Sequence, residues 1–167
     1  MSYHEHKRLS VEHVKCAVIT TSDSRTEAND ESGAYIKRRL VEAGHAVTHY
    51  DILKNDPVVL RDEIISLITD NDVQVIITTG GTGLSKKDVT VNTVKALLDK
   101  ELEGFGEVFR SLSYQEIGAG AIMSRALAGV ANSRVIICLP GSLGAVSLAM
   151  EKIIVSEIGH LVREATR

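Results

Sequence analysis

Four short runs of β-branched and aliphatic residues alternate with segments of helical character, and this alternation constrains the fold more than any other feature. The runs cover residues 14–21, 46–52, 73–79 and 134–139. Each has the length of a strand, and the runs 14–21, 73–79 and 134–139 also have the composition of a buried one. Parallel strands need long crossover connections, which are usually helices that cover the sheet. The sequence therefore predicts an α/β domain of three layers, α/β/α, with a mostly parallel central sheet.

Helix signals fill the segments between these runs. Helices are expected over residues 30–42, from Pro57 onward, over residues 90–98 and over residues 144–164. Gly44 ends the first of them as a typical C-terminal cap, and Pro57 stands where the first helical turn tolerates proline. The stretch 101–129 is mixed and rich in glycine, and its pattern favours no single element.

Length and composition indicate one domain. The chain has 167 residues, of which 44% are hydrophobic and only 4% aromatic, with no Trp. The core must therefore consist of Val, Ile, Leu and Ala, as in parallel sheets covered by helices. We expect a flexible N-terminal arm over residues 1–13 and a single domain over residues 14–167. The net charge of −3 gives no basic field for nucleic acid.

The cysteines and the first residues indicate the environment of the protein. Cys16 and Cys138 lie in apolar runs without metal-ligand spacing, so we expect buried, reduced thiols. The first 13 residues are polar and charged, unlike a signal or transit peptide. No run approaches the roughly 20 apolar residues that cross a membrane. The sequence thus predicts a cytoplasmic protein with no membrane partner.

Small polar residues follow three of the predicted strands. In open parallel sheets, ligands bind beyond the carboxyl ends of the strands, so these residues are expected to converge. The candidate ligand-binding residues are Thr21, Ser22, Asp23, Ser24, Thr79, Gly80, Gly81, Thr82, Gly83, Pro140, Gly141 and Ser142.

The segment 80–83, Gly-Gly-Thr-Gly, is the most informative of these. Glycine permits positive φ, so that successive amides can point into one concavity and hold an anion. The alternative is a tight strand-to-helix turn without a ligand. The residues do not form a dinucleotide fingerprint, because Lys86 stands at the sixth position, and they lack the Gly-Lys-Ser/Thr of a P-loop.

Asp88 follows the glycines and two lysines, Lys86 and Lys87. A carboxylate near an anion site is understandable if it holds Mg²⁺ that bridges phosphates. Alternatively, Asp88 is a carboxylate favoured at a helix start, beside solvated lysines. Asp23 and Asp56 also lie near strand ends and are further candidates for metal binding. Asp30 is either a fourth candidate or an ordinary helix cap.

These segments resemble, in order and over nearly the whole chain, the MoaB/MogA family of molybdenum cofactor biosynthesis proteins. The matching segments are TSDSR (21–25), NDESG (29–33), ITTGGTGLSKKDVT (77–90), GFGEVFRSLSYQEIG (104–118), MSRALAG (123–129) and LPGS (139–142). The segment 104–118 favours the MoaB branch. Two departures are Val91-Asn92, where the family often has Pro-Glu, and Leu143, where it often has proline.

The resemblance implies a MoaB/MogA-like three-layer fold that binds molybdopterin at the strand ends. It also implies Mg-ATP-dependent adenylylation of molybdopterin, which releases pyrophosphate before metal insertion. Residues matching Asp56 and Asp88 would be the catalytic carboxylates and Mg²⁺ ligands. Serine and glycine loops, with Ser113 and Ser124 in the matching segments, would hold the pterin and its phosphate. The partners implied are ATP, other proteins of the pathway and further copies of the chain, as a trimer or hexamer.

Two alternatives to an adenylyltransferase remain. One is a binding or scaffold protein of the same pathway that holds molybdopterin without turnover. The other is an enzyme acting on a different phosphorylated ligand, which only the anion-site argument supports. Residues 144–164 are apolar almost all round, which favours a subunit contact. Complete coverage by the sheet and the neighbouring helices is the other explanation.

Overall fold

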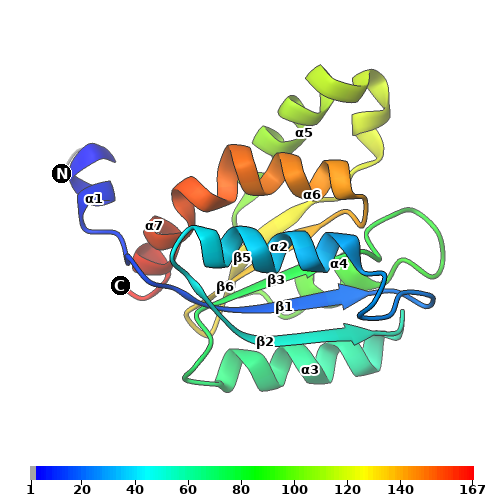
Figure 1. Ribbon diagram of the computed structural model, residues 1–167, viewed down its shortest axis with the longest axis horizontal. Coiled ribbons are helices and arrows are strands. Elements are labelled where there is room, and N and C mark those ends of the chain that lie inside the picture. Colours follow the sequence, from blue (N-terminus) through cyan, green and yellow to red (C-terminus); the bar gives the residue numbers. More distant parts are fainter. Residues whose placement is uncertain (1–2) are drawn as a thin grey trace.

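The computed structural model describes residues 3–167 and forms one six-stranded sheet between helices (Figure 1). Its strands lie in the order β2-β1-β3-β6-β5-β4. The strand bounds are β1 Lys15–Thr21, β2 Ala46–Leu53, β3 Val75–Thr79, β4 Lys100–Glu101, β5 Leu127–Ala131 and β6 Arg134–Leu139. β2, β1, β3 and β6 are parallel, whereas β5 pairs antiparallel with both of its neighbours, β6 and β4. The expected three-layer, mostly parallel α/β domain is confirmed.

Helices cover both faces of this sheet. Their bounds are α1 Tyr3–Arg8, α2 Glu31–Glu42, α3 Pro57–Thr69, α4 Thr90–Lys95, α5 Glu103–Ile117, the 3₁₀ helix η1 Gly118–Met123, α6 Leu143–Ala149, the π-helix η2 Met150–Ile154 and α7 Val155–Ala165. Three of the helices are capped at their N-termini, since the side chains of Asp30, Asp56 and Ser142 accept backbone amides at the starts of α2, α3 and α6.

The two faces of the sheet carry separate hydrophobic clusters, because successive strand residues point to opposite faces. In β1, Cys16 and Val18 pack with α2, α5, α6 and α7. Ala17 and Ile19 pack instead with α3 and α4. Figure 1 shows α3 on one side of the sheet and α2 and α6 on the other. Both cysteines are free and buried, as expected, and burial raises the pKa of each thiol to about 12.

The stretch 101–129, which the sequence left unassigned, becomes α5, η1 and the start of the antiparallel pair β5–β6. Phe105 and Phe109, one helical turn apart, anchor α5 in the core. α5 and η1 project beyond the body of the domain (Figure 1). The expected helix over residues 90–98 is shorter, since α4 ends at Lys95.

The long terminal helix is present as three consecutive segments, with the π-turn η2 in its middle. Most of its apolar residues pack within the chain, so the sheet and its neighbours explain much of its composition. Ile153 and Leu161 are only partly buried and line a groove beside α5. The assembly into a trimer or hexamer stays a prediction.

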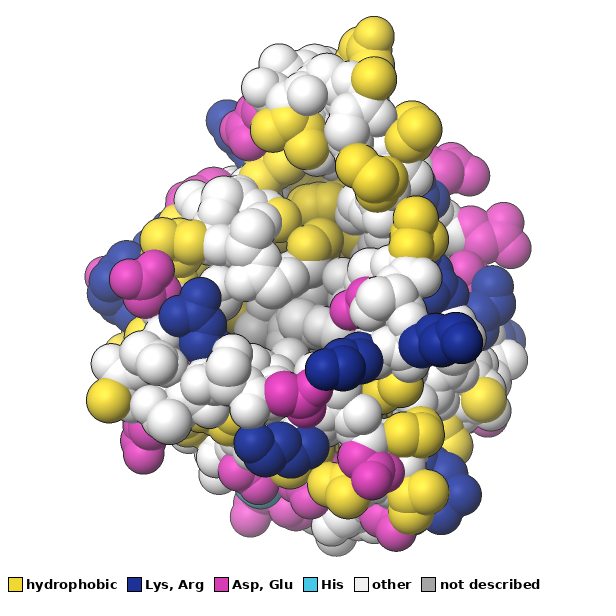
Figure 2. Space-filling model, turned by 90° about the vertical axis from the view of Figure 1, so that its right-hand side faces the viewer, with side chains coloured by type: hydrophobic (Ala, Val, Ile, Leu, Met, Phe, Trp, Pro, Cys, Tyr) yellow, Lys and Arg dark blue, Asp and Glu magenta, His cyan; other side chains and the backbone are white. Residues whose placement is uncertain are grey.

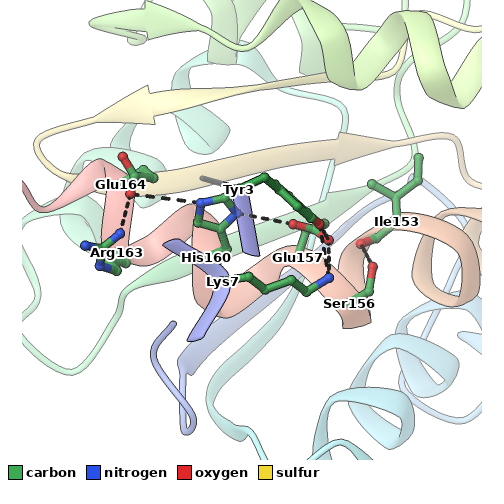
Figure 3. Close-up of polar contacts among 8 residues, drawn as sticks. All are labelled: Tyr3, Lys7, Ile153, Ser156, Glu157, His160, Arg163 and Glu164. Atoms are coloured by element: carbon green, nitrogen blue, oxygen red, sulfur yellow. Dashed lines mark hydrogen bonds and ion pairs between the residues drawn. The ribbon is translucent and has the colours of Figure 1, made fainter. Parts of the chain in front are cut away.

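The described part of the segment expected to be a flexible arm contains α1. Tyr3 and Lys7 reach Glu157 on α7, with the Tyr3 hydroxyl 2.8 Å and the Lys7 ammonium 2.7 Å from the same carboxylate oxygen (Figure 3). The hydrogen bonds from Lys7 and Tyr3 lower the pKa of Glu157, against its partial burial. Among the helices of residues 3–167, none is long and apolar enough to cross a membrane.

Candidate functional site

The main pocket lies at the carboxyl edge of the sheet, between the strand ends and the projecting α5–η1 unit. It has a volume of about 480 Å³. Figure 2 looks onto this edge, where the surface is hollowed and hydrophobic side chains gather on one side of the hollow. The pocket is lined by Gly80, Gly81, Thr82, Gly83, Asp88, Phe109, Ser113, Ile117, Gly120, Ala121, Met123, Ser124, Pro140, Gly141, Ser142 and Ala145.

The glycine loop after β3 forms the polar floor of the main pocket. Gly80 and Gly81 have φ of +91° and +66°, a conformation that favours glycine. A Cβ on Gly80 would overlap the carbonyl oxygen of Thr21, so β1 and the loop approach each other more closely than any side chain allows. Thr90 fixes the loop from the other side, since its amide donates to the Gly81 carbonyl and its hydroxyl to the Gly80 carbonyl, both at 2.9 Å.

This fixed loop leaves amides available for a ligand. Among the residues that the structure describes, no hydrogen-bond acceptor is found for the amides of Gly81 and Thr82. Unpaired amides in a loop with positive φ are the usual elements of an anion-binding concavity. The floor can therefore hold a phosphate without a lysine or arginine in its lining.

Asp88 completes the floor as an ionised carboxylate. The Ser85 hydroxyl and amide donate to its Oδ2 at 2.7 and 3.0 Å. The hydroxyl hydrogen bond is the largest cause of a lowered pKa for Asp88, supported by the amides of Ser85 and Gly83 and by the charge of Arg125. The Arg125 guanidinium also donates to the Gly83 carbonyl at 3.4 Å and to Asn92.

The opposite wall is apolar and comes from α5 and η1. Phe109 is buried beneath it, whereas Ile117 and Met123 are 64% and 58% exposed. Ser113 is the polar exception, at 7% exposure and facing the same pocket. The main pocket therefore offers amides and a carboxylate on one side and an aliphatic surface on the other.

A smaller side pocket of about 150 Å³ adjoins the main pocket on the α2 face of the sheet. The two pockets share Gly80, Gly141 and Ser142. The other residues of the side pocket are Thr20, Thr21, Ser22, Arg25, Asp30, Glu31, Ser32, Thr79 and Leu143. The Ser32 hydroxyl donates to the Gly141 carbonyl at 2.9 Å and ties α2 to the loop after β6.

Asp30 is the helix cap that the sequence allowed as one of two roles. Its Oδ1 accepts the Gly33 amide at 3.0 Å, and its Oδ2 accepts the hydroxyls of Thr20 at 2.6 Å and Tyr50 at 2.8 Å. It is 4% exposed. Burial of the phenol, together with this hydrogen bond to Asp30, raises the pKa of Tyr50.

The structure distributes the expected site residues over three places. Those in the main pocket are Gly80, Gly81, Thr82, Gly83, Asp88, Ser113, Ser124, Pro140, Gly141 and Ser142. Thr21, Ser22 and Thr79 line the side pocket instead, and the Thr79 hydroxyl donates to the Pro140 carbonyl at 2.9 Å. Asp23, Ser24 and Asp56 line neither of the two pockets.

The two carboxylates outside the pockets have structural partners. Asp56 caps α3, accepting the amides of Val58 and Val59 at 2.8 and 3.1 Å. Asp23 accepts the amide of Asn55 at 3.0 Å, and this hydrogen bond is the largest cause of its lowered pKa. Within residues 3–167, no three or more His, Cys, Asp or Glu side chains are grouped so that they could hold a metal.

The sequence did not single out the apolar wall or Arg25 as parts of the site. The spacing of Phe105 and Phe109 is the signal that would have revealed α5 and its contribution. Arg25 is in the segment TSDSR, but the sequence alone does not indicate that it lines a pocket with the start of α2.

Comparisons with known proteins agree with this geometry. Residues 17–160 match the model of the family described as "Probable molybdopterin binding domain". The chain is 46% identical over 168 residues to molybdenum cofactor biosynthesis protein B of Bacillus cereus. The alignment covers 100% of this chain and 99% of the relative. The protein of the same name from Bacillus subtilis is also 46% identical, over 98% of this chain and 97% of the relative.

Solved structures give the same result. A crystal structure of a molybdenum cofactor biosynthesis protein B superposes with a TM-score of 0.90 and 47% identity, covering 93% of this chain and 97% of the other. The tungsten cofactor synthesizing protein MoaB from Pyrococcus furiosus superposes with a TM-score of 0.84 and 37% identity, covering 95% and 100%. A MogA structure is 27% identical, covering 90% and 99%, with a TM-score of 0.80.

Proposed function

The chain belongs to the molybdopterin-binding family of molybdenum cofactor biosynthesis proteins and, from that premise, we propose that it transfers AMP from ATP to the terminal phosphate of molybdopterin. The observation that carries the proposal is the two-sided main pocket. Its floor offers unpaired amides of the glycine loop, and its wall offers the aliphatic side chains of Ile117 and Met123.

Molybdopterin has a matching two-sided chemistry, with a flat pterin at one end and a phosphate at the other. The phosphate fits the amides of Gly81 and Thr82, since such concavities hold anions. The pterin fits against the aliphatic wall, where Ser113 is a polar group to orient it. The volume of about 480 Å³ lies in the range of pockets that enclose small ligands.

The proposed reaction needs no protein nucleophile. A phosphate oxygen of molybdopterin attacks the α-phosphorus of ATP, the bond to the bridging oxygen of the β-phosphate breaks, and pyrophosphate leaves with that electron pair. The obstacle is the repulsion between two anions. Fixed amides and precise positioning lower that barrier, which is what a rigid loop held by Thr90 supplies.

Asp88 is suited to bind the Mg²⁺ that such a reaction uses. It is ionised, since hydrogen bonds from Ser85 lower its pKa, and it lines the main pocket. Mg²⁺ needs only one or two protein carboxylates when substrate phosphates supply further ligands, and it would neutralise their charge. Asp56 already caps α3 through Oδ1, so only its second oxygen would assist.

The test is incubation of the protein with molybdopterin and Mg-ATP, following AMP transfer and pyrophosphate release. We expect Mg²⁺-dependent transfer that falls at least about a hundredfold in Asp88→Asn, the scale seen when one electrostatic group of a catalytic site is removed. Asp62→Asn is the matched control, because Asp62 lies exposed on α3 beside Arg61. Normal turnover and normal Mg²⁺ dependence in Asp88→Asn would contradict the role of Asp88.

Binding without turnover is the second candidate function. The observation that favours it is the use of Asp56 as a helix cap, which leaves Asp88 as the one carboxylate in the lining of the main pocket. Tight molybdopterin binding with no AMP transfer at any Mg²⁺ concentration would establish this candidate.

A further inference from the structure

We propose that the side pocket is a diphosphate subsite, in which Arg25 receives the β- and γ-phosphates of the nucleotide and holds the leaving pyrophosphate. The inference rests on the proposed function and deepens it, because it places the leaving group. The main pocket then holds molybdopterin alone, with the reacting phosphates between the two pockets.

The two pockets adjoin each other at a common ridge. They share Gly80, Gly141 and Ser142, so a ligand phosphate at this ridge reaches both. Gly80 and Gly141 pack so closely that a Cβ on Gly141 would lie 3.2 Å from the Gly80 Cα. Between Gly80 and Gly141 the ridge is thus backbone without side chains, over which a polyphosphate can pass. An α-phosphorus at the ridge would face molybdopterin on one side and its own leaving group on the other.

The side pocket is too small for a whole nucleotide. At about 150 Å³ the side pocket is well below the roughly 300–1,000 Å³ of pockets that enclose whole small-molecule ligands. It can therefore take the diphosphate end of a nucleotide but not the nucleoside. The sugar and base would lie outside it.

Arg25 supplies positive charge to the side pocket. It is the cationic residue in the lining of the side pocket. One guanidinium nitrogen, Nη1, donates to the Asn29 carbonyl at 3.0 Å, which holds the side chain in place. No carboxylate pairs with Arg25 in the part of the chain that the structure describes. Its remaining donors suit the fork geometry of phosphate recognition.

Two carboxylates in the same lining must be reconciled with an anionic ligand. Asp30 is enclosed by three donors, from Thr20, Tyr50 and Gly33, which compensate its charge. Glu31 is exposed at the start of α2 and has no such donors in the described chain. Its negative charge therefore repels metal-free diphosphate and should weaken binding. Removal of this charge is thus expected to strengthen binding, the opposite of the effect expected when Arg25 is replaced.

The reaction balances in this arrangement. The bond that forms joins a molybdopterin phosphate oxygen to the α-phosphorus, and the bond that breaks joins the α-phosphorus to the bridging oxygen of the β-phosphate. Pyrophosphate keeps the electron pair of the broken bond. Arg25 donates hydrogen bonds to the charge that develops on this leaving group, and no oxidant or further reactant is needed.

The test measures binding of inorganic pyrophosphate to the full chain by calorimetry, in buffer freed of divalent cations. Arg25→Gln should weaken binding about tenfold or more, since a charged hydrogen-bond donor is lost. Glu31→Gln should tighten binding a few-fold, because a repulsive charge is removed. Arg61→Gln, an exposed arginine on α3, is the matched control and should bind as the parent chain does. Arg25 and Glu31 are both exposed, so unchanged melting curves should accompany these changes.

The outcomes separate the subsite from the proposed function. No pyrophosphate binding, equal binding to Arg25→Gln, or orthophosphate bound as tightly as pyrophosphate would overturn the subsite, even if AMP transfer occurs. Binding of pyrophosphate that depends on Arg25 would support the subsite even if AMP transfer fails, which would then count against the proposed function alone. Where transfer occurs, pyrophosphate should also inhibit it more weakly in Arg25→Gln.

Discussion

The floor and the wall of the main pocket are built on opposite principles. The floor is backbone held at close range, with Gly80 against Thr21 and the loop tied to Thr90. The wall is a helix end whose side chains Ile117 and Met123 remain largely exposed. A Cβ on Gly120 in the wall would meet only the Ile117 side chain, at 3.7 Å. The floor therefore tolerates almost no added atom, whereas the wall has room.

This difference indicates a division of labour. A rigid floor suits a phosphate, whose charge needs donors fixed before it arrives. A looser aliphatic wall suits a flat ring, for which shape and apolar contact matter more than exact position. Substitutions in the floor should thus affect stability and binding together, and substitutions in the wall should affect binding alone.

The largest expected effect comes from Gly80→Ala. The added Cβ would overlap the Thr21 carbonyl and would require positive φ from alanine, at a cost of about 3 kcal/mol in the free energy of unfolding. Chemical denaturation measures it, and molybdopterin binding should be lost as well. Gly120→Ala in the wall is the control, with an expected change within about 0.5 kcal/mol. Equal losses in the free energy of unfolding of Gly80→Ala and Gly120→Ala would contradict the difference in rigidity between floor and wall.

An intermediate effect is expected from Ile117→Ser. Ile117 is 64% exposed, so the free energy of unfolding should change by less than about 0.5 kcal/mol. Molybdopterin affinity should nevertheless fall about fivefold, since part of the apolar surface offered to the pterin is lost. Val108→Ser on the same helix, outside the main pocket and 50% exposed, should leave affinity unchanged. A large loss of stability in Ile117→Ser would mean that the wall is as rigid as the floor.

The smallest effect is expected from Ser85→Ala. Loss of the Ser85 hydroxyl should raise the pKa of Asp88 toward its usual value, as followed by NMR titration of that carboxyl group. A lowered pKa contributes stability above the pKa of the unfolded chain, and this contribution is lost as pH falls through the pKa of the folded state. The difference in the free energy of unfolding between the parent chain and Ser85→Ala should therefore be present at neutral pH and disappear in acid. A difference that persists below the folded pKa would show that Ser85 acts on the loop without Asp88.

The sequence was informative where local chemistry and topology coincide. β6 was predicted at its observed bounds, Arg134–Leu139, since a short apolar run bounded by polar residues has few other solutions. The position of the glycine loop was predicted from a different rule, that ligands bind at strand ends, which needs only the order of the elements. The place of Asp88 near that loop also followed from its distance along the chain.

Other features depended on contacts that no local pattern encodes. The stretch 101–129 holds an antiparallel strand and the wall, and β5 is specified mainly by its pairing with β6. Asp56 and Asp88 were both predicted to be metal-binding carboxylates. In the structure, Asp56 caps its own helix, α3, whereas Asp88 lines the main pocket.

The sequence by itself determined the parallel α/β architecture, the glycine loop and the family, because each is a matter of residue order and local conformation. Only the tertiary structure decided that the strand-end residues divide between two pockets, that Arg25 belongs to the smaller one, and that α5 and η1 supply the wall. The physical reason is that these relations join segments distant along the chain. Packing on the two faces of the sheet, and not local preference, brings those segments together.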